Sequence, residues 1–407
     1  MLQLRVFTVL GVIMLCGCMT LPQGRKGVSF KKDVAFLSKH LDVVVLSDSL
    51  SKGQVAVVPG LQGRVMTSSA AGLSGTSYGW VNRDLIASGK TVEHMNAYGG
   101  EDRFWIGPEG GQFSVFFAKG VPFDLEHWVT PAAIDTEPFE VVAQDRGRLV
   151  MSKDMHLNNY SGCEFDVHVD REVRVLERAE ISAALGIAPV PSVKAVGFET
   201  RNVMVNRGTR PWKRETGLLS LWILGMFNPS PATTVVVPYV SGETDELGPI
   251  VNDAYFGKVP VERLVVGDGV LFFSGDGQYR SKIGLSPMRA KPVLGSYDAI
   301  DKVLTIVQYN KPTGARDYVN SMWALQEEPY KGDVVNSYND GPPALDVKPL
   351  GPFYELETSS PAATLGVGGT ITHIHRTLHL TGPEEALDPI ARKLLGVNLA
   401  DIKSAIR

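Results

Sequence analysis

Apolar and polar residues alternate or cluster along most of this chain in the manner of β-strands. Short β-branched and aromatic runs recur, separated by Gly, Pro, Asn and Asp, which favour turns. Within residues 165–170 the alternation is strict, as in a strand with one buried face. The pattern predicts a mainly β protein of antiparallel sheets. The expected strands lie at 43–46, 54–58, 113–117, 147–151, 165–175, 194–205, 233–239, 263–273, 303–309 and 370–380.

Two segments have the spacing of an amphipathic helix, residues 31–40 and residues 384–407. No internal repeat or change of composition divides residues 30–407, so we expect a single β-sandwich domain that ends in one C-terminal helix over 384–407. A domain boundary near residues 189–191 is the alternative. The buried stripe of the C-terminal helix would contain Leu387, Ile390, Leu394 and Leu395.

The N-terminus has the parts of a bacterial export signal. Arg5 precedes an apolar stretch at 6–15 that is too short to span a bilayer, and Leu15-Cys16-Gly17-Cys18 matches a lipobox. We expect residues 1–17 to be removed as a signal peptide, Cys18 to carry the lipid, and 18–29 to act as a tether. The protein would then be held on a membrane of the cell envelope, at the periplasmic face or the outer surface. An ordinary signal peptide or an uncleaved anchor helix is the alternative.

The overall composition is that of a globular protein and excludes some classes of partner. Of the 407 residues, 44% are hydrophobic and 21% charged, with a formal net charge of -4. This balance gives no basic footprint for nucleic acid. Apart from the expected lipid-bearing Cys18, Cys163 is the only cysteine beyond the signal, so a disulfide within the mature chain and a zinc site built from several cysteines are excluded. We expect Cys163 to be a small core residue.

The densest polar cluster lies in residues 97–111, where two glycine pairs bracket a run of charged and aromatic residues. Glycine permits close backbone approach, and Arg and Trp beside acids suit a sugar, whose ring stacks on indole while its hydroxyls bind charged groups. The alternative is a structural hairpin with a salt bridge. The candidate ligand residues of this cluster are Glu101, Asp102, Arg103, Trp105 and Glu109.

Residues 99–111, Gly-Gly-Glu-Asp-Arg-Phe-Trp-Ile-Gly-Pro-Glu-Gly-Gly, resemble the Gly-Gly-x-Arg-x-Trp-x-x-Pro-Glu signature of uncharacterised bacterial lipoproteins in the galactose mutarotase-like (aldose 1-epimerase-like) superfamily. Residues 58–65, 206–222 and 353–370 resemble further elements of that superfamily in the same order. The resemblance spans roughly 43–380. It implies a galactose mutarotase-like β-supersandwich with a sugar-sized cleft on one face.

The same resemblance implies site residues. Phe353-Tyr354-Glu355-Leu356-Glu357-Thr358 is similar to the strand that carries the mutarotase base, which makes Glu357 the candidate catalytic base. Glu355 would share its face of the strand, and a solvent-facing carboxylate is the alternative for Glu357. The expected substrate-binding residues are Arg64, Glu101, Asp102, Arg103, Trp105, Glu109, Trp222 and Glu355.

The chain departs from the mutarotase pattern at the catalytic acid. Mutarotases carry a histidine on the strand near Trp222, but here no histidine stands between His168 and His373. Trp222 can stack on a sugar but cannot usefully protonate a ring oxygen. Any catalysis would therefore depend on Glu357 and not on a histidine of the mutarotase type.

Four other histidines could replace the missing acid. His373 and His375 alternate on one strand, so they could bind a metal or a sugar with a nearby glutamate, or simply face solvent. His94 and His127 flank the glycine-rich cluster and could line the same cleft or be structural. We expect no resident metal or cofactor.

Three classes of function remain open. The chain could be a carbohydrate enzyme, such as an epimerase with a replaced acid, a lyase or a hydrolase. It could be a non-catalytic glycan-binding lipoprotein, or a structural protein of the cell envelope. The charged cluster and Glu357 favour a carbohydrate-active or carbohydrate-binding lipoprotein, and the missing histidine favours binding over mutarotation. The identity of the sugar does not follow from these residues.

Overall fold

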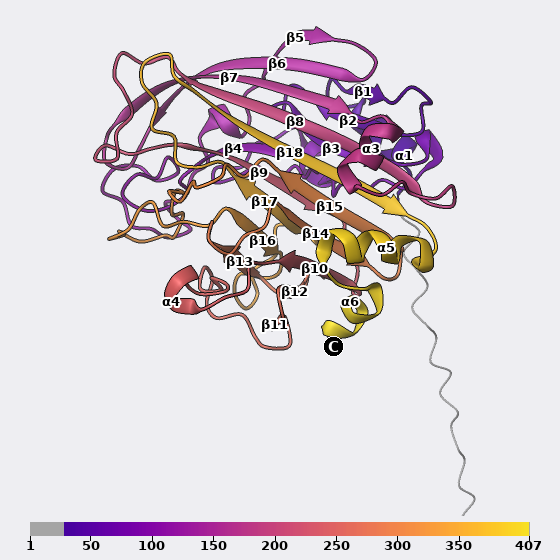
Figure 1. Cartoon of the computed structure of the whole chain (residues 1–407). Helices are drawn as coiled ribbons and strands as arrows, with labels where there is room; N and C mark the ends of the chain where they lie inside the picture. Colours follow the sequence, from indigo (N-terminus) through magenta and orange to yellow (C-terminus); the bar gives the residue numbers. More distant parts are fainter. Residues whose placement is uncertain (1–27, 407) are drawn as a thin grey trace, which may run out of the picture.

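Three antiparallel sheets form the framework of residues 28–406, the part of the chain that the computed structural model describes (Figure 1). The largest has ten strands in the order β11-β12-β10-β14-β15-β18-β8-β7-β6-β5, the second has the order β13-β16-β17-β9-β4, and the third β1-β2-β3. The predicted architecture, mainly β with helix at the C-terminal end, is confirmed. The expected signal peptide, Cys18 and nearly all of the tether lie outside the described residues.

The strands are β1 (Val44–Ser47), β2 (Gln54–Val58), β3 (Arg64–Ser69), β4 (Arg103–Gly107), β5 (Glu140–Gln144), β6 (Arg148–Asn158), β7 (Glu164–Val175), β8 (Lys194–Asn206), β9 (Ser220–Phe227), β10 (Thr233–Pro238), β11 (Leu264–Val266), β12 (Val270–Ser274), β13 (Ser281–Leu285), β14 (Val293–Asp298), β15 (Val303–Tyr309), β16 (Val335–Asn339), β17 (Tyr354–Ser359) and β18 (Thr370–Thr381). The α-helices are α1 (Phe30–Leu37), α2 (Arg83–Ser88), α3 (Arg178–Leu185), α4 (Thr244–Leu247), α5 (Glu384–Leu395) and α6 (Leu399–Ala405), with 3₁₀ turns η1 (Gly72–Ser74) and η2 (Ala132–Ile134).

The five-stranded sheet has one face in the sandwich core and one face on a cleft. Successive side chains of a strand point to opposite faces. On β9, Trp222 and Leu224 line the cleft, so Leu221 and Ile223 face the other way. All four side chains are almost fully buried, because the core covers one face and loops cover much of the other. This explains why β9 reads as a continuous apolar run.

Helices α3, α5 and α6 cover the outer face of the ten-stranded sheet (Figure 1). Leu378 and Leu380 of β18 belong to the same buried cluster as Leu387 of α5. The predicted single helix over 384–407 is wrong, because Gly396 takes a left-handed conformation (φ 74°) and ends α5. The next helix begins after Asn398, whose side chain accepts a hydrogen bond from the Asp401 amide at 2.7 Å.

Two predicted strands and one predicted core residue are also corrected. Residues 113–117 form a loop rather than a strand. The segment is rich in aromatic and apolar residues because their side chains pack into the core. Residues 263–273 form two strands, β11 and β12, separated by a turn at Gly269 (φ 70°). Cys163 is half-buried beside the turn that joins β6 to β7.

No helix within residues 28–406 has the length and apolarity needed to span a membrane.

Candidate functional site

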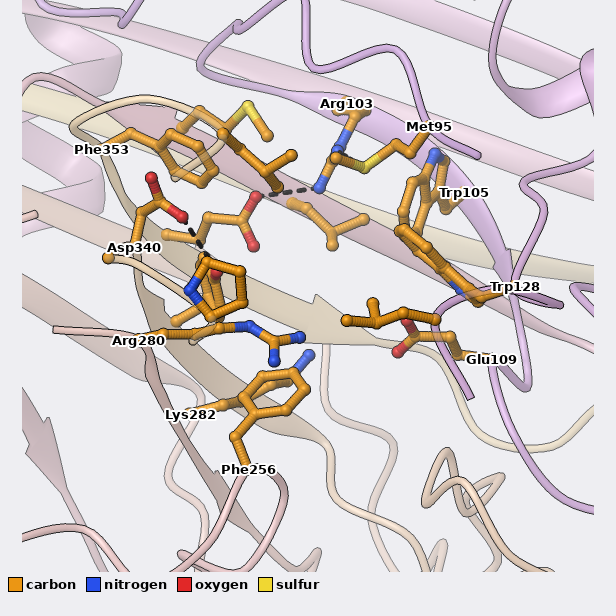
Figure 2. A pocket seen from close by; sticks show the side chains of 18 of the residues that line it. Met95, Arg103, Trp105, Glu109, Trp128, Phe256, Arg280, Lys282, Asp340 and Phe353 are labelled. Carbon is orange, nitrogen blue, oxygen red and sulfur yellow. Dashed lines mark hydrogen bonds and ion pairs between the residues drawn. The ribbon is translucent and has the colours of Figure 1, made fainter. Parts of the chain in front are cut away.

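A cleft of about 150 Å³ lies on the outward face of the five-stranded sheet (Figure 2). Strand pairing brings its polar groups together, because Lys282 lies opposite Tyr338, which lies opposite Glu355 on the next strand. Residues far apart in sequence therefore share one surface. The side chains of the sheet that line the cleft are Arg103, Trp105, Trp222, Leu224, Met226, Lys282, Tyr338 and Glu355, and loops add Glu109, Trp128, Phe256, Arg280, Trp323 and Asp340 among others.

Four tryptophans form an aromatic wall. Trp105 and Trp222 are directly paired across β4 and β9, with ring centroids 5.4 Å apart in an edge-to-face arrangement. Trp128 lies 6.4 Å from Trp105, and Trp323 lies 5.6 Å from Trp128. The Trp128 carbonyl contacts His94 Nδ1 at 2.9 Å, so His94 holds the loop that carries this ring. The wall gives the cleft an extended apolar face suited to stacking.

Two ion pairs lie against this wall. Arg103 donates from Nη2 to Glu355 Oε1 at 2.9 Å, and its guanidinium carbon lies 4.2 Å from the centre of the Trp105 ring. Glu357 Oε2 accepts hydrogen bonds from Trp222 Nε1 at 3.0 Å and from Lys282 Nζ at 3.1 Å. Glu355 lines the cleft, whereas Glu357 is fully buried beneath it. The two glutamates do share a face of β17, as alternation predicts, but only Glu355 is among the residues that line the cavity.

Burial shifts the ionisation of these groups. It raises the pKa of Glu355 to about 8; Arg103 opposes this rise, and the adjacent Glu357 carboxylate adds to it. Glu357 Oε1 is buried and has no hydrogen-bond partner within residues 28–406, and its closeness to the Glu355 carboxyl contributes to the raised pKa of Glu355. Burial also raises the pKa of Glu109, against the attraction of Lys282. For Lys282 burial alone would lower the pKa, but Glu357 and the other carboxylates raise it.

The mouth of the cleft is built from residues that sequence reasoning missed. The guanidinium of Arg280 stacks 3.7 Å from the centre of the Phe256 ring. Tyr338 donates to Asp340 at 3.0 Å, and burial raises the pKa of Asp340 to about 6. A detectable signal was Lys282, a charged residue inside the otherwise uncharged strand β13.

Three predicted binding residues lie outside the cleft. Arg64 is fully buried and donates to Gln62 Oε1 and to the Gly99 carbonyl. Burial lowers its pKa to about 9, and the nearby Arg103 adds to this effect. Glu101 accepts hydrogen bonds from the Ser68 amide and hydroxyl and contacts His379 Nε2 at 2.9 Å.

Asp102 pairs with Arg171 of β7 at 2.5 Å and accepts a hydrogen bond from Thr200. The prediction that Arg64, Glu101 and Asp102 contact substrate is therefore corrected, because each is fully buried in a structural hydrogen-bond network. Asp102 forms a structural salt bridge, which was the alternative to a ligand role, and its partner is Arg171 rather than Arg103.

The histidine hypotheses are corrected as well. His373 and His375 are fully buried, and both contact the Thr358 hydroxyl at 2.8 Å. Thr358 lies on the opposite face of β17 from Glu355, so neither the solvent-facing interpretation nor a shared site with the cleft glutamates holds. Burial lowers the pKa of His373 to about 3 and of His375 to about 4.

Among residues 28–406, no cluster of three or more His, Cys, Asp or Glu side chains is arranged to hold a metal ion. His127 also lies outside the cleft lining and pairs with Asp124 at 2.6 Å in the loop before Trp128. Like His94, it belongs to the support of that loop rather than to the cavity.

The fold and the cleft together define a class: a mainly β, antiparallel sandwich protein with a small-ligand cleft of mixed aromatic and charged lining. The chain belongs to the family of unknown function DUF6786, whose model matches residues 28–406. No curated protein matches the chain.

Several solved structures are similar to it at low sequence identity. The Slr1438 protein of Synechocystis sp. PCC 6803 is 12% identical with a TM-score of 0.47, covering 84% of this chain and 96% of its own. A galactose mutarotase-like protein from Lactobacillus casei ATCC 334 is 11% identical with a TM-score of 0.45, covering 83% and 100%. A galactose mutarotase related enzyme from Lactobacillus acidophilus is 8% identical with a TM-score of 0.44, covering 84% and 97%. The function proposed below rests on the cleft itself.

Proposed function

We propose that the protein binds a carbohydrate in this cleft. The observation that carries the proposal is the combination of the four-tryptophan wall with converging carboxylates and cations around a cavity of about 150 Å³. Indole faces attract the C–H faces of a sugar ring, while charged groups bind its hydroxyls. A purely apolar ligand would displace water from the charged groups of Arg103, Lys282 and Glu109 without offering them a hydrogen bond, which costs free energy.

A second candidate function is proton-transfer chemistry on the bound sugar. The pKa of Glu355, raised to about 8 by burial against the attraction of Arg103, allows this carboxyl to exchange a proton near neutral pH and to act as a general acid. Glu109, also on the cleft, has a raised pKa and can exchange a proton from another side of the ligand. The base assigned to Glu357 from resemblance stays a prediction; because Glu357 is covered by Trp222 and Lys282, we propose that it positions Lys282 and Glu355.

Binding can be tested directly by tryptophan fluorescence, because four of the six tryptophans line the cleft. In a panel of monosaccharides, we expect some sugars to bind and to quench or shift the tryptophan emission in a saturable manner. Trp323→Ala should weaken binding because it removes a stacking surface. Phe123→Ala removes a half-buried ring that does not line the cleft and should leave affinity unchanged. Absence of saturable binding across the panel would overturn the proposal.

The enzymatic candidate has its own readout, an NMR time course of anomer exchange on each bound sugar. If Glu355 is the acid, Glu355→Gln should slow exchange by on the order of a hundredfold while binding persists. Glu357→Gln should reduce it less, because its carboxyl does not face the ligand. Loss of activity confined to Glu357→Gln would restore Glu357 as the reactive group. Sugar binding without any anomer exchange would contradict the enzymatic candidate and support the non-catalytic binding function.

We also propose that the protein is a lipoprotein of the cell envelope. The support is the sequence of residues 1–18, with its basic start, apolar stretch and lipobox cysteine. The tether over residues 18–29 would then place the cleft-bearing sandwich near the membrane surface.

A further inference from the structure

Arg280 differs from the other cations of the cleft. Arg103 and Lys282 are each paired with a glutamate. Arg280 lines the same cleft and stacks on Phe256, yet no carboxylate within residues 28–406 forms an ion pair with it. Figure 2 shows Arg280 and Lys282 reaching into the cavity from one side, with Glu109 on the other. An arginine in this state presents guanidinium donors to whatever occupies the cavity.

Lys348 adds a second cation of the same kind. It lies in the exposed loop after β16, lines the cleft, and forms no ion pair within the described part of the chain. The nearby carboxylate of Asp340 is already engaged, because it accepts hydrogen bonds from Tyr338 and from the Gly351 amide at 2.9 Å. Arg280 and Lys348 therefore line the cleft as two cations without an ion-pair partner within residues 28–406, although the Asp340 and Glu109 carboxyls attract Arg280 at longer range.

A planar guanidinium with a stacked face matches the paired oxygens of an anion, which is the usual reason to place arginine rather than lysine at such a position. Glu109, on the far side, would repel the same anion. We infer that Arg280 and Lys348 form an anion subsite, so that the ligand is a sugar bearing a carboxylate or sulfate group, oriented with this group towards Arg280 and away from Glu109. This inference rests on the proposed carbohydrate function and names the class of sugar.

Matched pairs of ligands test the inference in the full-length protein by titration calorimetry. Galacturonate and galactose share a ring and differ only in the C6 carboxylate, as do glucuronate and glucose, and galactose 6-sulfate separates sulfate from carboxylate. We expect the preferred anionic sugar to bind about tenfold or more tightly than its neutral partner at low salt, as for hydrogen bonds to charged groups. The preference should shrink as salt is added.

The variants then locate the subsite. Arg280→Gln should remove most of the preference while affinity for the neutral sugar persists, Arg280→Lys should keep part of it, and Lys348→Gln should weaken it less. Arg201→Gln changes an exposed arginine of β8 outside the cleft lining and is the matched control. Thermal melting of each variant verifies that it is folded.

Each outcome has a distinct meaning. Equal affinity for neutral and anionic sugars in the wild-type protein would overturn the anion subsite and leave carbohydrate binding intact. A preference that survives Arg280→Gln would overturn the assignment to Arg280. Failure to bind either kind of sugar would overturn the proposed function itself.

Discussion

Glu355 and Glu357 are two residues apart on β17 and face the same side, yet their surroundings differ. Glu357 accepts hydrogen bonds from an indole N–H and an ammonium group. The Glu355 carboxyl pairs with Arg103, but burial and the nearby Glu357 carboxyl raise its pKa to about 8. A buried carboxyl with a raised pKa is suited to the role of a general acid.

The raised pKa of Glu355 predicts a pH-dependent stability. In the unfolded chain this carboxyl ionises near its ordinary value of 4.5, but in the folded protein only near about 8. Its contribution is therefore fully present below pH 4.5 and is lost as the pH rises towards 8, because the unfolded state binds fewer protons. Glu355→Gln keeps a donor towards Glu357 and cannot ionise. Its stability relative to wild type should rise between pH 5 and pH 8, measured by urea unfolding; parallel curves would contradict the shift.

At the scale of the element, β17 divides two separate polar systems. Its glutamates face the cleft, and Thr358, one residue on, faces the core between the two large sheets. There a single hydroxyl contacts both His373 and His375 of β18. The other ring nitrogens, His373 Nδ1 and His375 Nε2, are buried without a hydrogen-bond partner within residues 28–406. This part of the core therefore depends strongly on Thr358.

Replacing Thr358 with valine keeps its shape and removes the shared hydroxyl. Two buried imidazoles would each lose their side-chain partner, so we expect a loss of about 1–3 kcal/mol in the free energy of unfolding. Thr370→Val, at an exposed position of β18, is the control and should change stability little. Sugar affinity should be unaffected because Thr358 points away from the cleft. An unchanged urea midpoint for Thr358→Val would show that the histidines find other partners.

At the scale of the whole molecule, a buried ion pair joins the segment before β4 to the ten-stranded sheet. Asp102 and Arg171 are both fully buried, and Arg171 also donates to Asn202 Oδ1 at 2.5 Å and to the Gly63 carbonyl. This network connects β3, β7 and β8 with the start of the cleft strand. It anchors Arg103 one residue further along the chain.

Asp102→Ala should destabilise the fold by about 3–5 kcal/mol, because it leaves the Arg171 charge buried and unpaired. Denaturant unfolding measures this loss. The double variant Asp102→Ala with Arg171→Met should recover part of it, since the unpaired charge is then absent. If the single variant folds with normal stability but loses sugar affinity, Asp102 would have the ligand role that its buried position argues against.

The proposed membrane attachment predicts the fate of the N-terminus. A lipid thioether requires a thiol, so wild-type protein grown with labelled palmitate should incorporate label and Cys18→Ser should not. More of the Cys18→Ser variant than of the wild-type protein should be found in the soluble fraction. Cys163→Ser controls for acylation of the other cysteine beyond the signal and should remain labelled. Wild-type protein that never takes up palmitate would refute the anchor.

The sequence by itself determined the β character of the chain, most strand positions of the ten-stranded sheet and the shared face of Glu355 and Glu357, because alternation is a local property of extended backbone. It also indicated the cluster with Arg103, Trp105 and Glu109. The end of α5 at Gly396 could also have been predicted, because glycine commonly ends a helix, but one continuous helix was expected there.

Only the tertiary structure decided which candidates reach the cleft. Arg103 faces the cavity while its neighbours Glu101 and Asp102 are consumed by contacts with β3 and β7, and no local pattern encodes that difference. Lys282 and Arg280 join the site because the sheet order places β13 beside β16, which in turn pairs with β17, and these segments are distant in sequence. The physical reason is that sequence periodicity sets the face on which a side chain lies, whereas what covers that face depends on which strands become neighbours.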